Sequence, residues 1–136
     1  MPIRILLVDD SPDFLKALSR FLASDPEIQV VDHACSAQDA LEKIKQSPVD
    51  LVLMDIAMPG TNGLEATRLI KAQANAPRVL ILTLYDSGEY RAEAQAVCAD
   101  GFVSKVACDD RLLPLIYTLF PRSPEAVAER TPGNEV

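Results

Sequence analysis

The sequence predicts an α/β domain in which helices cover both faces of a five-stranded parallel sheet. Short apolar runs alternate five times with segments of helical periodicity, and this alternation is typical of parallel sheets. The runs contain few polar residues, as expected for strands that are covered on both sides. With 136 residues, 49% of them apolar, the chain has the size of one domain and leaves little room for a second.

The first half of the chain is predicted to hold three strands and two helices. The first apolar run is broken only by Arg4. Ser11 and Pro12 are the residue types of a helix N-cap and a first helical position, and Ser36 with Asp39 resembles a capping box. The predicted strands are Ile3–Val8, Ile28–Val31 and Val49–Met54, and the helices run from Pro12 to Asp25 and from Ser36 to Ser47.

The second half repeats the strand and helix pattern after a turn-rich loop at residues 58–63. Residues 121–136 contain three prolines and show no periodicity, so they are predicted to be a disordered tail or the stump of a linker. The predicted helices are Leu64–Ala74, about Asp86–Val97 and about Asp109–Phe120, and the strands between them are Arg78–Leu82 and Phe102–Ser104.

Composition excludes several classes of function. A net charge of −7 argues against direct nucleic-acid binding by this chain, because such binding neutralises phosphates. The single histidine, His33, excludes a multi-histidine metal site. Three cysteines without C-x-x-C spacing indicate reduced thiols and a cytoplasmic protein. No apolar run approaches the roughly 20 residues of a membrane helix, so no membrane contact is expected.

Polar residues stand at the carboxyl ends of four predicted strands. Asp9 and Asp10 follow the first strand, Asp55 the third, Thr83 the fourth and Lys105 the fifth. Ligands of open parallel sheets bind outside the carboxyl ends of the strands. If the strand order is 2-1-3-4-5, these four strands are consecutive neighbours and their polar side chains converge in one crevice.

Three clustered carboxylates repel one another and need a counter-charge. A hard divalent cation with oxygen ligands supplies it, and Mg²⁺, or Mn²⁺ in its place, prefers such a site. Lys105 adds a fixed positive charge. A carboxylate nucleophile with a metal, an amine and a hydroxyl suits the capture of a phosphoryl group.

The chain resembles the receiver domain of two-component response regulators, over roughly residues 3–120. The matching motifs are Leu-Leu-Val-Asp-Asp (6–10), Met-Asp-Ile-Ala-Met-Pro-Gly (54–60), Gly63-Leu64, Leu-Thr (82–83) and Gly-Phe-Val-Ser-Lys (101–105). The resemblance implies a receiver domain at residues 1–120, with a flavodoxin-like, doubly wound sheet of order 2-1-3-4-5 and five helices.

The resemblance also implies a role for each matching position. Asp55 is the implied phospho-acceptor. Asp10 and Asp55 would bind Mg²⁺ through their carboxylates, Asp9 mostly through water and Ala57 through its backbone carbonyl. The remaining implied roles are those of Thr83 as the switch hydroxyl, Lys105 as the family's lysine and Phe102 as the aromatic residue whose rotamer reports activation.

The expected function is a phosphorylation-dependent signalling switch. A histidine kinase or a phosphotransfer protein would present a phosphohistidine, and the surface formed by residues 86–120 would change. The chain would catalyse its own phosphotransfer without being an enzyme in the ordinary sense. Ala57 has no polar side-chain atom to orient water and Tyr85 would shield the site, so we expect slow self-dephosphorylation.

Two departures narrow the resemblance to the NarL-type branch of receivers. Val106 follows Lys105 where many receivers have proline, and residues 84–90 look NarL-like. Proteins of that branch normally carry a C-terminal helix-turn-helix domain, which these residues lack. The chain is therefore either a single-domain regulator or a receiver cut from a longer protein.

Three alternatives follow from the same residues. A phosphatase of the haloacid-dehalogenase type would need a second aspartate where this chain has Ala57. A flavodoxin-like cofactor module would need a phosphate-binding loop where Asp9 and Asp10 would repel a phosphate. A receiver-like module could also act through protein contacts alone, without phosphorylation.

The last predicted helix has almost no polar face. One side must cover the sheet, and an apolar surface on the other side would mark an interface. We therefore predict self-association, or docking of a partner, through this helix. The candidate interface residues are Leu112, Leu115, Ile116, Tyr117, Leu119 and Phe120.

Overall fold

A computed structural model describes residues 2–56, 63–84 and 87–121. Its five strands are all parallel, in the order β2-β1-β3-β4-β5, and five helices connect and follow them, as predicted. The strands are β1 Ile3–Val8, β2 Ile28–Ala34, β3 Leu51–Asp55, β4 Arg78–Thr83 and β5 Gly101–Ser104; the helices are α1 Pro12–Ala23, α2 Ala37–Gln46, α3 Gly63–Lys71, α4 Gly88–Ala96 and α5 Cys108–Leu119.

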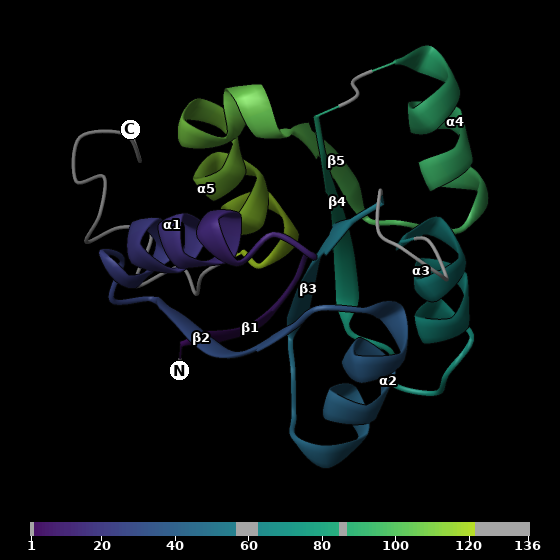
Figure 1. The fold of residues 1–136 in the computed structure, drawn as a ribbon, viewed down its shortest axis with the longest axis horizontal. Helices are drawn as coiled ribbons and strands as arrows, with labels where there is room; N and C mark the ends of the chain where they lie inside the picture. The colour runs from purple at the N-terminus through teal and green to yellow at the C-terminus, as the bar shows by residue number, and fades with distance from the viewer. Residues whose placement is uncertain (1, 57–62, 85–86, 122–136) are drawn as a thin grey trace, which may run out of the picture.

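The sheet is the middle of three layers (Figure 1). Helices α1 and α5 cover one face, and α2, α3 and α4 cover the other. Alternation along β1 divides its side chains between the two faces: Ile5 and Leu7 pack toward α1 and α5, whereas Leu6 and Val8 pack with the other cluster. Across the described ranges, no helix has the length and apolar character needed to cross a membrane.

Serine hydroxyls cap the amino-terminal ends of three helices. The hydroxyl of Ser11 accepts a hydrogen bond from the amide of Phe14 at 3.3 Å, and that of Ser36 accepts one from Asp39 at 3.1 Å. Ser87 caps α4 in the same way through Tyr90. These bonds satisfy amides that have no partner within the helix. They confirm the predicted starts of α1 and α2, whereas α4 begins at Gly88.

The ends of several elements differ from the prediction. Strand β2 continues to Ala34, because Asp32 and His33 pair with β1 after a register shift while their side chains are exposed. Strand β3 begins at Leu51, directly after Asp50, whose carboxylate accepts a hydrogen bond from the Arg4 amide. Residues with exposed side chains at a sheet edge can therefore extend a strand beyond its apolar run.

Three other boundaries also shift. Helix α3 ends at Lys71 instead of Ala74, and Asn75 then turns the chain with a φ of 58°. Strand β4 includes Thr83, which pairs with Ser104 of β5. A 3₁₀ turn, η1 (Lys105–Ala107), comes between β5 and α5, which starts at Cys108.

The predicted exposed apolar face of the last helix is wrong in its main premise. Leu112 and Ile116 of α5 are fully buried in the core, so they cannot form an interface. The other candidates, Leu115, Tyr117, Leu119 and Phe120, are half-buried and pack against the same core. Among the described residues, the exposed large apolar side chains are Leu69, Leu84 and Val106, all outside α5.

Contacts from neighbouring elements explain this burial. The hydroxyl of Tyr117 donates a hydrogen bond to the carboxylate of Asp25, which follows α1. The guanidinium of Arg78 lies 6.0 Å from the ring centroid of Phe120. Both flanks of α5 therefore have polar partners that helical periodicity in the sequence does not reveal.

A charge cluster joins the amino-terminal ends of β4 and β5. One carboxylate oxygen of Asp100 accepts hydrogen bonds from the Lys71 ammonium and the Val79 amide, both at 2.8 Å. Its other oxygen lies 3.3 Å from Arg78. Burial by itself would raise the pKa of Asp100, but the hydrogen bonds and the two cations outweigh it and hold that pKa below its ordinary value of 3.8.

We expect Asp100→Asn to destabilise the protein at neutral pH and to lose that effect in acid. Because the folded-state pKa is lowered, the stability that the carboxylate contributes is fully present above pH 3.8 and is lost as pH falls through the lower folded-state value. At neutral pH the loss should be about 2 kcal/mol, the scale of hydrogen bonds to a charged group.

Urea unfolding of the two proteins between pH 7 and pH 3 checks this expectation. The gap between the unfolding free energies of wild type and variant should narrow as the solution becomes acidic. Asp13→Asn, at an exposed acid in the first turn of α1, is the matched control. A gap that stays constant with pH would contradict the assignment.

Candidate functional site

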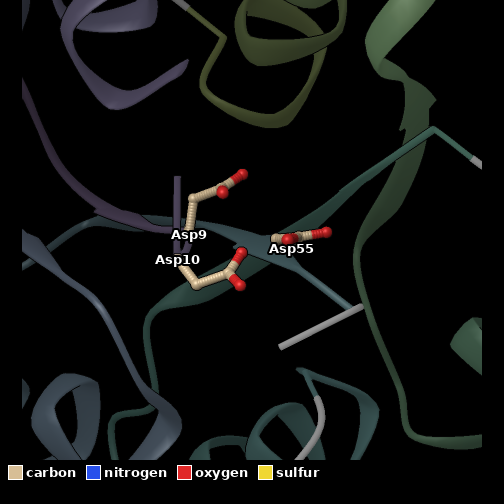
Figure 2. A group of neighbouring side chains, drawn as sticks. All are labelled: Asp9, Asp10 and Asp55. Atoms are coloured by element: carbon tan, nitrogen blue, oxygen red, sulfur yellow. The ribbon is translucent and has the colours of Figure 1, made fainter. Parts of the chain in front are cut away.

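Three carboxylates meet at the carboxyl ends of β1 and β3. Asp9 and Asp10 follow β1, and Asp55 is the last residue of β3 (Figure 2). One oxygen from each lies within 4.8 Å of the others. Asp9 and Asp55 are buried, whereas Asp10 is exposed, so the cluster has one side that is open to solvent. The structure thus brings together the three predicted metal-binding carboxylates.

Lys105 supplies a cation to this cluster from the first position of η1. Its ammonium lies 2.6 Å from Oδ2 of Asp9 and 3.7 Å from Oδ2 of Asp55. The lysine side chain is 10% exposed, so both ion pairs lie in a largely desolvated environment. Such pairs are weakly screened by salt, and breaking one leaves an uncompensated buried charge.

The other two predicted switch residues occupy neighbouring strands. Thr83 is fully buried at the end of β4. Phe102 is half-buried in β5, beside Ile81 of β4. The guanidinium of Arg91, from α4, lies 4.7 Å from the ring centroid of Phe102. That stacking distance is within the range of a cation–π contact.

Gly63 allows α3 to begin directly against the site. A Cβ at this position would lie 2.1 Å from the carbonyl oxygen of Asp55 and 2.7 Å from Cα of Ile56. The amide of Gly63 also donates to the carbonyl of Ile56 at 3.2 Å. The sequence marks Gly63 as part of a turn and a family motif, but this backbone approach is visible in the structure alone.

Two predicted residues cannot be placed. Ala57 and Tyr85 lie outside the described residues, and the roles predicted for them stay predictions. Conversely, Phe14 contacts Lys105 and Arg91 contacts Phe102, and no sequence motif marks Phe14 or Arg91 as part of the site. Both contacts join distant segments, so no local sequence pattern signals them.

The donor set fits a hard divalent cation. The ligand atoms that Asp9, Asp10 and Asp55 offer are all carboxylate oxygens. Magnesium favours such oxygens and retains several waters, for which the exposed side at Asp10 leaves space. Lys105 balances part of the negative charge but cannot balance three carboxylates. The geometry therefore defines an acidic pocket with one fixed cation and a buried hydroxyl nearby.

This combination of fold and site is that of a receiver domain, and the comparisons agree. The pattern of the response regulator receiver domain family matches residues 5–117. The chain belongs to this family, whose members act in two-component signalling as phosphorylation switches. Receiver domains are in general signalling modules and not enzymes.

Three similar proteins illustrate the relationship. A protein-glutamate methylesterase/protein-glutamine glutaminase from Nocardioides sp. is 37% identical over 133 residues, which cover 88% of this chain and 36% of that protein. The transcriptional regulatory protein LnrK of Bacillus subtilis is 34% identical over 117 residues, 86% of this chain and 53% of its own. The structure of a LuxR-family two-component response regulator from Aurantimonas sp. gives a TM-score of 0.84 at 31% identity, covering 95% of each chain.

The chain spans about half, or less, of the length of these two curated relatives. The likeness to a LuxR-family regulator agrees with the NarL-type branch that the motifs indicate.

Proposed function

We propose that this receiver domain accepts a phosphoryl group on Asp55, with Mg²⁺ bound in the acidic pocket. The observation that carries the proposal is the position of Lys105, whose ammonium lies within 4 Å of carboxylate oxygens of both Asp9 and Asp55. A phosphoryl group on Asp55 would add negative charge beside a cation that is already in place.

The chemical step needs a nucleophile and a leaving group in line. A carboxylate oxygen of Asp55 attacks phosphorus of a phosphohistidine, so that a P–O bond forms as the P–N bond breaks. The imidazole leaves with the bonding electron pair and takes up a proton from solvent. Lys105 then neutralises the transferred oxygens, and the hydroxyl of Thr83 hydrogen-bonds to one of them.

The metal would be held by the carboxylates of Asp10 and Asp55, with Asp9 reached mostly through water. When bound, Mg²⁺ offsets the negative charge that the incoming phosphoryl oxygens add to the pocket. Without that charge, three carboxylates facing an anionic donor would repel it. Sequence resemblance adds the backbone carbonyl of Ala57 to this ligand set.

The output of the switch is a change in the surface formed by α4, β5 and α5. Phe102 lies on β5 next to the strand that carries Thr83, so a movement of the hydroxyl can alter the packing of that ring. Receiver domains interact with histidine kinases or phosphotransfer proteins, and we propose such a donor here. Self-association through the half-buried side chains of α5 stays a prediction.

Intact mass after incubation with Mg²⁺ and acetyl phosphate tests the proposal. We expect one phosphoryl adduct on the wild type and none on Asp55→Asn, which keeps the shape of the side chain and removes its nucleophilic charge. Asp13→Asn changes an exposed acid and should be phosphorylated like the wild type.

Two other results of the phosphorylation experiment would contradict the proposal. An adduct on Asp55→Asn would place the reaction elsewhere. No adduct with acetyl phosphate or with a phosphohistidine donor would favour a module that acts through contacts alone. After donor removal, we expect the adduct to decay slowly, because Ala57 has no polar side-chain atom to orient water and because of the shielding role that the sequence predicts for Tyr85.

A further inference from the structure

We infer that Phe14 is a positioning residue that holds the Lys105 ammonium against the carboxylates. The inference rests on the proposed function and extends it to a residue of α1. The ammonium nitrogen of Lys105 lies 4.1 Å from the ring centroid of Phe14. The same nitrogen is 2.6 Å from Asp9, so the cation lies between an aromatic face and a carboxylate.

A cavity beside Lys105 gives its side chain space for other conformations. A space of about 280 Å³ lies between α1 and the start of α5, and Lys105 and Phe14 both line it. Ala17, Leu18, Phe21 and Cys108 form the rest of its wall. A flexible lysine side chain beside an open cavity has other conformations available to it, and the aromatic face favours the one that points to the site.

The backbone of Phe14 is linked by hydrogen bonds to the site that its ring supports. Oδ1 of Asp9 accepts a hydrogen bond from the amide of Ser11 at 2.9 Å, and the Ser11 hydroxyl accepts one from the amide of Phe14. Oδ2 of Asp9 binds Lys105, which faces the Phe14 ring. These contacts therefore form a closed network of interactions through Asp9, Ser11, Phe14 and Lys105.

This network is important when the Lys105 ammonium exchanges Asp9 for a phosphoryl group as its binding partner. In the proposed reaction Lys105 moves from Asp9 toward phosphoryl oxygens on Asp55. Its ammonium already lies 3.7 Å from Oδ2 of Asp55. During that exchange its contact with Asp9 is lost. The aromatic face accepts the ammonium from any direction above the ring, so it can stay in contact throughout.

Two substitutions at one position separate the aromatic face from apolar bulk. Phe14→Leu keeps an apolar side chain but removes the ring, whereas Phe14→Tyr keeps the ring. Phe21→Leu makes the same change about two turns further along α1, in the wall of the same cavity. Thermal unfolding confirms that each variant is folded before it is compared.

Two readouts are then compared. The first is the rate of phosphoryl uptake from acetyl phosphate. We expect Phe14→Leu to be about five- to thirtyfold slower than wild type, the range for loss of a desolvated cation–π contact, and Phe14→Tyr and Phe21→Leu to stay within about twofold. The second is the NMR signal of the Lys105 ε-methylene, assigned by its absence in Lys105→Arg.

The NMR signal reports the contact without any phosphorylation. An aromatic face shifts nuclei above it upfield, so we expect an upfield signal in wild type and Phe14→Tyr, and its return to the ordinary position in Phe14→Leu. A wild-type signal at the ordinary position would overturn the inference. So would equal rates for Phe14→Leu and wild type, or equal slowing in Phe21→Leu or Phe14→Tyr.

Failure of the proposed function has a different signature. If the wild type takes up no phosphoryl group, the proposed function fails and the rates say nothing of Phe14. The lysine signal then decides alone whether Phe14 holds Lys105.

Discussion

Gly63→Ala should lower the free energy of unfolding by about 3 kcal/mol, at the upper end of the cost of overpacking. The new methyl group would lie 2.1 Å from the carbonyl oxygen of Asp55 and 2.7 Å from Cα of Ile56. Both are backbone atoms, which cannot move aside as a flexible side chain can. The steric clash is relieved only if α3 moves away from the end of β3 or the end of β3 shifts.

Urea unfolding measures the loss, and Gly88→Ala provides the control. A Cβ at Gly88 has no neighbour within 4 Å, so that variant should be as stable as wild type or slightly more stable. Because a shift of β3 would move Asp55, phosphoryl uptake by Gly63→Ala should also fall. Equal stability of the two alanine variants would contradict the predicted steric clash at Gly63.

Lys105→Met should destabilise the metal-free protein by about 3 kcal/mol, the scale for breaking a buried ion pair by removing one partner. Methionine keeps most of the apolar stem but leaves the buried carboxylates of Asp9 and Asp55 without their ammonium. Lys45→Met, on the exposed side of α2, changes the net charge equally and should have little effect.

Two additions to this experiment test the electrostatic cause. Mg²⁺ should stabilise Lys105→Met more than the wild type, because the metal supplies the positive charge that the variant lacks. Adding Asp9→Asn to Lys105→Met should recover part of the loss, since the carboxylate 2.6 Å from the ammonium is then neutral. A loss that neither addition reduces would indicate a packing effect instead.

Most of the fold could be predicted from apolar runs and caps. Strand β1 and helix α1 have the predicted starts, because Ile3–Val8 is apolar and Ser11 is an N-cap. The strand order came from the family resemblance and not from periodicity. The predicted end of β2 was wrong. Asp32 and His33 are polar and therefore lie outside the apolar run, but a strand at the edge of the sheet can expose polar side chains.

The site was predictable where it depends on strand ends and not where it depends on packing. Asp9, Asp55 and Thr83 follow from the rule that parallel strands end at one edge of the sheet. The support of Lys105 by Phe14 depends on how α1 packs beside η1, which no local pattern encodes. The exposed face predicted for the last helix failed for the same reason, since Asp25 and Arg78 contact its flanks.

The two ends of the sheet differ in how well their carboxylates are neutralised. At the carboxyl end, three carboxylates face the single ammonium of Lys105. At the amino end, carboxylates are paired with cations: Asp100 with Lys71 and Arg78, and Asp50 with Arg4. The excess negative charge at the carboxyl end creates a local electric field that draws divalent cations toward the site, and this field weakens as salt is added.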